Sequence, residues 1–173
     1  EGSKSKITVT FLSDGYEDKE KFIDRVQGSI IALTKTATYG PWKEYFTFNY
    51  VDKLHNDLCE ESSKNYGNCD LAKAQKYASK CPHDKIIVLS HKEFRSHAYK
   101  GIAAFNSMRY KISQNESSTE YYELKPEDPY FINLINHEFG HLAFELEDEY
   151  IEENAKMRIA EGPNCFPNRG YGI

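Results

Sequence analysis

The sequence lacks the features that would place it in a membrane, on a nucleic acid or around a group of thiolates. No apolar run approaches the roughly 18 residues of a transmembrane helix, so we expect no membrane span. Lysine and arginine are scattered and the formal net charge is −5, which gives nucleic-acid binding no electrostatic support. No C-x-x-C pair occurs, so neither a zinc finger nor a thioredoxin-like motif is expected.

The residues needed for a folded core are present. Apolar residues make up 39% of the chain and aromatic residues 14%, which argues against disorder despite a charged fraction of 28%. A length of 173 residues suits a single domain, and we expect residues 1–173 to form one.

Cys59, Cys69, Cys81 and Cys165 are an even number of cysteines at wide spacing. This pattern favours two disulfides in an oxidising compartment, with three possible connectivities. Four independent buried thiols are the alternative. The polar segment 52–68 is predicted to be a loop tied by Cys59 and Cys69.

Hydrophobic periodicity predicts a mixed α/β fold, in which about four strands form a sheet flanked by helices. The run at 85–90 is continuously apolar, which is typical of a central parallel strand. A strand at 101–105 is expected at an edge, and 112–128 is expected to be a loop. The other predicted elements are strands at 7–12 and 45–51 and helices at 17–36, 70–80 and from 128 onward.

The most informative segment is the H-E-x-x-H pattern of His137, Glu138 and His141. Asp128 and Pro129 are typical of a helix start, so the pattern falls late in a helix. Residues four apart on a helix share one face, so both imidazoles can bind one zinc ion. Glu138 can then act as general base for a metal-activated water. Zinc is the expected ion for two histidines and a carboxylate.

A tetrahedral catalytic zinc site needs a third protein ligand. His97 is a candidate outside the motif, although a lone histidine is more often a surface or packed residue. Glu145 is too close along the same helix to reach the metal, so a later ligand requires that the helix end and the chain turn back. The residues alone leave the choice open among the acidic residues that follow the motif: Glu145, Glu147, Asp148 and Glu149.

The segment 137–150, HEFGHLAFELEDEY, resembles the pattern H-E-x-G-H-x-x-x-x-L-x-D-E-Y of the M64 (IgA-peptidase) family of secreted zinc endopeptidases. Weaker similarities at 12–16, 45–49, 85–89 and 162–165 extend the resemblance over most of the chain. The resemblance implies a metzincin-like α+β zincin fold with H-E-x-x-H on the active-site helix. It also implies that Glu138 is the base and that the zinc ligands are His137, His141 and Asp148, with Glu149 as the second choice for the third.

The sequence departs from the family pattern where this helix must end. Relatives usually have glycine or a small residue near the positions of Phe144 and Glu145, because the turn often needs a positive φ. We therefore expect this turn to be strained or built differently. Residues 95–101 also differ from the glycines that the family tends to have ahead of the cleft-edge strand, which would reshape substrate access.

The leading hypothesis is a secreted or extracytoplasmic zinc-dependent endopeptidase that cleaves peptide or protein substrates in a cleft along the strand at 101–105. Its catalytic domain is either minimal or continued beyond Ile173. The alternative is a zinc-stabilised binding module that has lost catalysis, which the altered helix end favours and the presence of Glu138 disfavours. A third hypothesis is a metalloenzyme that acts on another amide bond.

Overall fold

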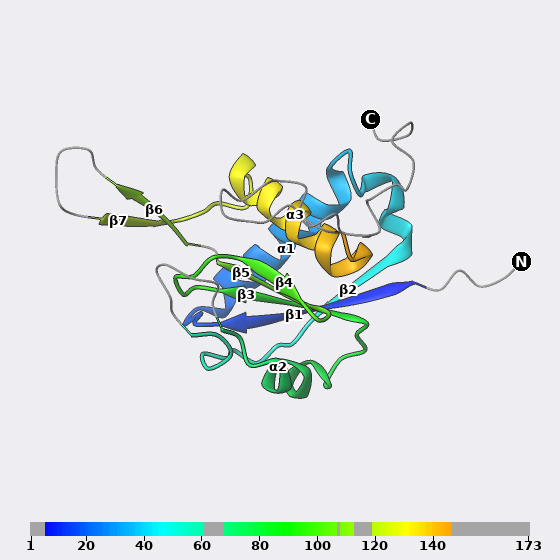
Figure 1. Ribbon diagram of the computed structural model, residues 1–173, viewed down its shortest axis with the longest axis horizontal. Coiled ribbons are helices and arrows are strands. Elements are labelled where there is room, and N and C mark those ends of the chain that lie inside the picture. Colours follow the sequence, from blue (N-terminus) through cyan, green and yellow to red (C-terminus); the bar gives the residue numbers. More distant parts are fainter. Residues whose placement is uncertain (1–5, 61–67, 107, 113–118, 147–173) are drawn as a thin grey trace, which may run out of the picture.

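A computed structural model of the chain describes residues 6–60, 68–106, 108–112 and 119–146. Strands and helices alternate at first, a run of strands follows, and a helix comes last (Figure 1). The elements are β1 (Ile7–Asp14), α1 (Lys19–Lys35), the 3-10 helix η1 (Gly40–Tyr45), β2 (Phe46–Tyr50), α2 (Leu71–Ala78), β3 (Lys85–Ser90), β4 (His97–Tyr99), β5 (Ile102–Asn106), β6 (Met108–Ile112), β7 (Thr119–Glu123) and α3 (Pro129–Phe144).

Five of the strands form one mixed sheet in the order β2-β1-β3-β5-β4. Neighbours are parallel except β4, which is antiparallel to β5. Helices α1 and α3 lie over one face of the sheet and α2 lies over the other (Figure 1). The predicted mixed α/β sheet with flanking helices is therefore confirmed at this level, with five strands in place of about four.

Two details of the predicted topology were wrong. The strand predicted at 101–105 is β5, which lies between β3 and β4, so the sheet edge is the short strand β4 instead. The segment 112–128 was expected to be a loop, but Thr119–Glu123 pairs with Met108–Ile112 as an antiparallel hairpin separate from the main sheet. β4 has only three residues, too few to carry a clear period, and β7 (TEYYE) lies in a polar segment whose composition indicated a loop.

The apolar pattern of β3 explains why this strand is central. Ile87 and Leu89 pack in the core beneath α1 and α3, whereas Ile86 and Val88 pack in the core above α2. All four side chains are buried, so a continuous apolar run is what the position requires. The prediction of a buried parallel strand at 85–90 is confirmed.

Capping residues set the starts of the helices. The Asp18 carboxylate accepts hydrogen bonds from the backbone N–H groups of Glu20 and Lys21, which fixes the start of α1. Asp128 accepts from the N–H of Tyr130 at 2.8 Å, and Pro129 occupies the first turn of α3. The predicted start of the last helix is thereby confirmed.

A buried carboxylate and a lysine tie the loop after β2 to the carboxyl end of the sheet. Asp14 is fully buried and accepts from the N–H of Leu58 at 3.0 Å and from Ser90 Oγ at 2.9 Å. Lys92 Nζ lies 3.0 Å from Asp14 Oδ1 and donates to the carbonyl of Cys59 at 2.8 Å. The charges of Asp14 and Lys92 therefore compensate each other inside the fold.

The predicted tie between Cys59 and Cys69 is confirmed, because these residues form a disulfide. Among the described residues Cys81 has no disulfide partner, and the expected second disulfide would have to join it to Cys165. Cys165 lies outside the described residues.

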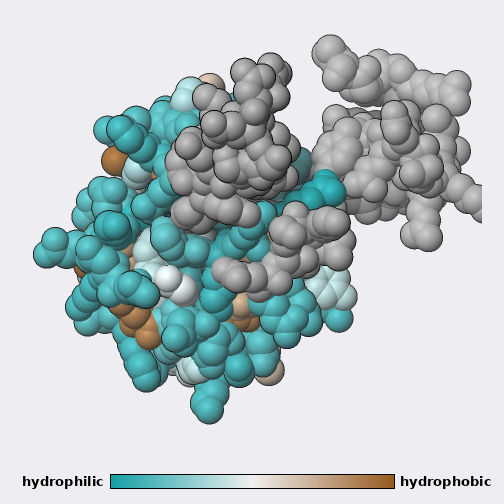
Figure 2. Space-filling model, turned by 90° about the vertical axis from the view of Figure 1, so that its left-hand side faces the viewer, coloured by the Kyte–Doolittle hydropathy of each residue, from teal (hydrophilic) through white to brown (hydrophobic). Residues whose placement is uncertain are grey.

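No helix in the described part of the chain is long and apolar enough to cross a membrane. On the face shown in Figure 2, the described surface is mostly hydrophilic and its apolar side chains appear only as small separate patches.

Candidate metal centre

Helix α3 brings the two motif histidines together on one face. Residues His137 and His141 lie one turn apart, and their rings are perpendicular with centroids 4.6 Å apart. Their Nε2 atoms are 3.2 Å apart. For two nitrogens bound to one tetrahedral zinc at about 2.0–2.1 Å each, the expected separation is roughly 3.3–3.4 Å. The spacing of the two imidazoles therefore fits a shared zinc ion.

The helix end fixes the tautomer of one of these rings. His141 Nδ1 is hydrogen-bonded to the backbone carbonyl of Leu146. Because a carbonyl only accepts, Nδ1 donates in this hydrogen bond, which leaves Nε2, on the side of His137, as the nitrogen that can bind a metal. A backbone carbonyl on the distal nitrogen is a common partner of metal-binding histidines.

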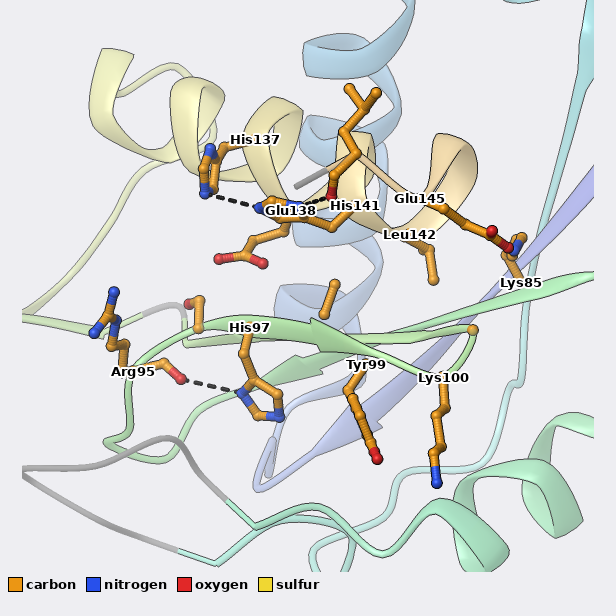
Figure 3. A pocket seen from close by; sticks show the side chains of 14 residues that line it. Lys85, Arg95, His97, Tyr99, Lys100, His137, Glu138, His141, Leu142 and Glu145 are labelled. Carbon is orange, nitrogen blue, oxygen red and sulfur yellow. Dashed lines mark hydrogen bonds between the residues drawn. The ribbon is translucent and has the colours of Figure 1, made fainter. Parts of the chain in front are cut away.

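Glu138 lies on the inner side of the same helix turn. Its side chain is directed from α3 towards β4, and the residue is only 6% exposed (Figure 3). It shares one cavity of about 670 Å³ with His137 and His141. A carboxylate at this position faces space in which a substrate would lie beside the two imidazoles.

A strained turn ends α3 directly after the motif. Glu145 has φ 56°, in the left-handed region, and its N–H donates to the carbonyl of His141 at 3.1 Å. The expectation of a strained or differently built turn is confirmed as strain, since Glu145 adopts the backbone conformation that glycine adopts most easily. Its side chain is directed away from the imidazoles towards Lys85, and so Glu145 lies in the cavity wall without approaching the histidines (Figure 3).

Contacts with α1 and the segment after it hold α3 in place. Tyr39 Oη donates to the carbonyl of Asn136 at 3.0 Å, and Thr36 Oγ1 lies 3.1 Å from Asn136 Oδ1. Burial raises the pKa of Tyr39 above its ordinary value, so its hydroxyl remains a donor. These positioning residues were not predicted, because nothing local in the sequence links residues 36 and 39 to a helix 100 residues later.

The opposite wall of the cavity is the edge hairpin β4–β5. Its two-residue turn is Lys100 and Gly101, both with positive φ (48° and 80°), the pattern of a type I′ turn. Residues 95–101 lie in this wall, and their effect on substrate access stays a prediction. The described residues that line the cavity are Lys85, Arg95, Ser96, His97, Ala98, Tyr99, Lys100, Gly101, His137, Glu138, His141, Leu142, Glu145 and Leu146.

The orientation of His97 does not support it as a third ligand. It pairs with Ala104 across the hairpin, and Ala104 faces the α2 side of the sheet. Figure 3 shows the His97 ring directed away from α3, and its Nδ1 lies 3.2 Å from the carbonyl of Arg95. Burial lowers the pKa of His97, which favours its neutral form.

Two of the three predicted ligands are thus brought together, and the third cannot be placed. Within the described ranges, no group of three or more His, Cys, Asp or Glu side chains converges on one metal position. The predicted third ligand, Asp148, lies outside the described residues, as do Glu147, Glu149 and Tyr150.

No protein-family model matches the sequence, and a search of curated proteins finds no match to it.

Proposed function

We propose that the chain is a zinc-dependent endopeptidase of the M64 type. The observation that carries the proposal is the pair of Nε2 atoms of His137 and His141, 3.2 Å apart, beside the buried Glu138 in one cavity. Two convergent imidazoles next to an acid–base group and an open cavity are what metal-assisted hydrolysis needs.

The roles of His137, Glu138 and His141 follow from their positions, and that of Asp148 follows from the family resemblance. His137 and His141 would hold the zinc, with Asp148 as the proposed third ligand. Bound zinc supplies a Lewis acid that polarises the scissile carbonyl and lowers the pKa of the attacking water. Glu138 accepts a proton from that water and passes it to the leaving amine nitrogen. Burial of Glu138 strengthens its interaction with the developing charges, because the local dielectric constant is low.

The substrate would lie along β4, on the wall opposite α3. β4 is the terminal strand of the sheet, and an extended peptide can add to such an edge by backbone hydrogen bonds. This proposal replaces the cleft expected along 101–105, because that strand is internal.

The binding-module alternative loses one of its arguments. It was favoured by Phe144 and Glu145 at the helix end, but Glu145 adopts the left-handed conformation that a glycine would adopt there. A structural zinc site would also have no use for a carboxylate aimed into an open cavity.

The first test is cleavage of a diverse peptide mixture by the zinc-loaded wild type and by Glu138→Gln. Glu20→Gln is the matched control, since Glu20 is an exposed residue on α1. We expect cleavage by the wild type and the control, and a loss of at least about 100-fold in Glu138→Gln without loss of zinc. If no protein cleaves although zinc is bound at one equivalent, the endopeptidase proposal is wrong.

The third ligand is tested by zinc content. We expect Asp148→Ala to lower the zinc bound per chain, measured by mass spectrometry after dialysis, whereas Glu149→Ala largely retains it. The reverse result would exchange the two roles.

A further inference from the structure

A second, smaller cavity lies under the edge of the sheet, next to the candidate site. Its volume is about 190 Å³, and it opens beside β4 on the side of the sheet that α2 covers. His97 and Tyr99 line both this cavity and the larger one, so the two cavities adjoin along the edge strand. The remaining lining residues are Asn68, Cys69, Leu71, Ile102 and Ala104.

The register of the hairpin explains why the two cavities lie on opposite faces. His97 and Tyr99 pair with Ala104 and Ile102, whose side chains belong to the core on the α2 side. Ala98 pairs with Ala103, which belongs to the core on the α3 side. Side chains alternate along a strand, so a peptide added at β4 would direct every second side chain towards α3 and the others towards α2.

The size and lining of the small cavity suit one apolar side chain. A cavity of about 150 Å³ lined by apolar groups holds benzene, so this volume accommodates a phenyl ring or a branched aliphatic group. It is smaller than the roughly 300 Å³ or more of drug-sized ligand pockets. Leu71, Ile102 and Ala104 supply apolar surface, and the Cys59–Cys69 disulfide holds one wall.

We propose that this small cavity is a specificity pocket, which takes one large apolar side chain of a peptide strand paired with β4. The proposal rests on the proposed function, because it assumes a peptide substrate at this edge. It assigns the recognition of that side chain to the α2 face of the sheet, whereas His137 and Glu138 lie on the α3 face. A side chain of the substrate that points towards α2 would then determine specificity, whereas the scissile bond would be cleaved on the α3 face.

The test uses binding rather than turnover, so that it does not depend on catalysis. Fluorescein-labelled six-residue peptides of alanine and serine, with one phenylalanine moved through each position, are titrated into zinc-loaded Glu138→Gln and followed by anisotropy. We expect the peptide with phenylalanine at one particular position to bind roughly 10- to 100-fold more tightly than the peptide without phenylalanine.

Two substitutions in that background locate the effect. Leu71→Trp fills the cavity from the start of α2, where Leu71 is half-buried, and should abolish the preference for phenylalanine. Ala72→Trp is the control, because Ala72 is exposed on the same helix and does not line the cavity. Thermal unfolding of both variants shows whether they are folded, and Leu71→Ala, which enlarges the cavity, should extend the preference to tryptophan.

The outcomes test the specificity pocket separately from the endopeptidase activity. A phenylalanine preference that Leu71→Trp removes and Ala72→Trp retains supports the pocket, even if the wild type cleaves no peptide and the peptidase proposal fails. No preference in any register, or a preference unchanged in Leu71→Trp and Leu71→Ala, overturns the pocket, even if the wild type is an active peptidase.

Discussion

Glu145 has a strained backbone conformation next to the candidate metal centre. Its positive φ ends α3 and lets the following residue, Leu146, return its carbonyl to His141. A side chain with a Cβ in this conformation costs about 1 kcal/mol or more, which glycine avoids. Strain of this kind is commonly retained where a turn must aim a functional group.

We therefore expect Glu145→Gly to raise the free energy of unfolding by about 1 kcal/mol, or the melting temperature by roughly 2–4 °C. Glu145→Ala is the control, because it removes the carboxylate but keeps the Cβ. Differential scanning calorimetry of the zinc-free proteins measures both. Equal melting temperatures for the two variants would show that the backbone conformation is not the source of the strain.

At Gly140, helix α3 packs closely against Tyr39. A Cβ built at Gly140 would lie 3.0 Å from Tyr39 Oη and 3.3 Å from Leu146 Cδ1. The same hydroxyl donates to the carbonyl of Asn136. The glycine inside the motif is thus explained by helix packing rather than by metal chemistry.

A double-mutant cycle tests this contact. We expect Gly140→Ala to be less favourable in the wild type than in Tyr39→Phe, by about 1 kcal/mol, because the hydroxyl that crowds the new methyl group is absent in the second background. Urea unfolding of the four proteins gives the coupling energy. A coupling near zero would place the crowding elsewhere, with Leu146 as the remaining neighbour.

Local sequence patterns were sufficient to predict the elements whose own residues show a clear apolar or capping pattern. The apolar run of β3 and the capped start of α3 were found because one short window contains the whole signal, and so His137, Glu138 and His141 could be placed on a helix. β4 has only three residues, and its edge position depends on which strands pair, which no local window contains. The inward path of Glu138 likewise depends on packing between elements far apart in the sequence. The hydrogen bond from His141 to Leu146 depends on the left-handed turn at Glu145, whose residue type does not indicate that conformation.

The disulfide stabilises the segment that leads into α2 and one wall of the small cavity. Cys59 and Cys69 are separated by 10 residues, and closing a loop of this size contributes roughly 2–3 kcal/mol in the chain-entropy model. We expect Cys59→Ala with Cys69→Ala to lower the free energy of unfolding by about that amount, measured by urea denaturation without reductant. Reductant should destabilise the wild type but leave the double variant unchanged; a wild type insensitive to full reduction would contradict this.

At the scale of the whole molecule, burial of histidines on the α2 side links stability to pH. The ring of His55 stacks on Tyr77 with centroids 3.8 Å apart. Burial lowers its pKa, helped by Lys53 and Lys80 and opposed by Asp57 and Asp14. The pKa of His97 is lowered by burial as well.

Because these pKa values are lower in the folded state, the unfolded chain takes up more protons as the pH falls. The stabilisation is fully present above the unfolded pKa of about 6.5 and is lost as the pH falls below it. We expect zinc-free protein to unfold at a lower urea concentration at pH 5.5 than at pH 7.5, and His55→Gln to reduce the difference. A midpoint independent of pH over this range would contradict the assignment.

Lys92 places a positive charge at the carboxyl end of the sheet that cannot be released into solution. Its ammonium group lies against Asp14 and the Cys59 carbonyl, much as a bound metal ion would lie among oxygen ligands, but it is covalently attached to the chain. EDTA would extract a zinc ion held by the proposed ligands His137 and His141, yet it has no means of removing the charge that neutralises Asp14. Inactivation by a chelator would therefore report on the proposed zinc site and leave the Asp14–Lys92 pair unchanged.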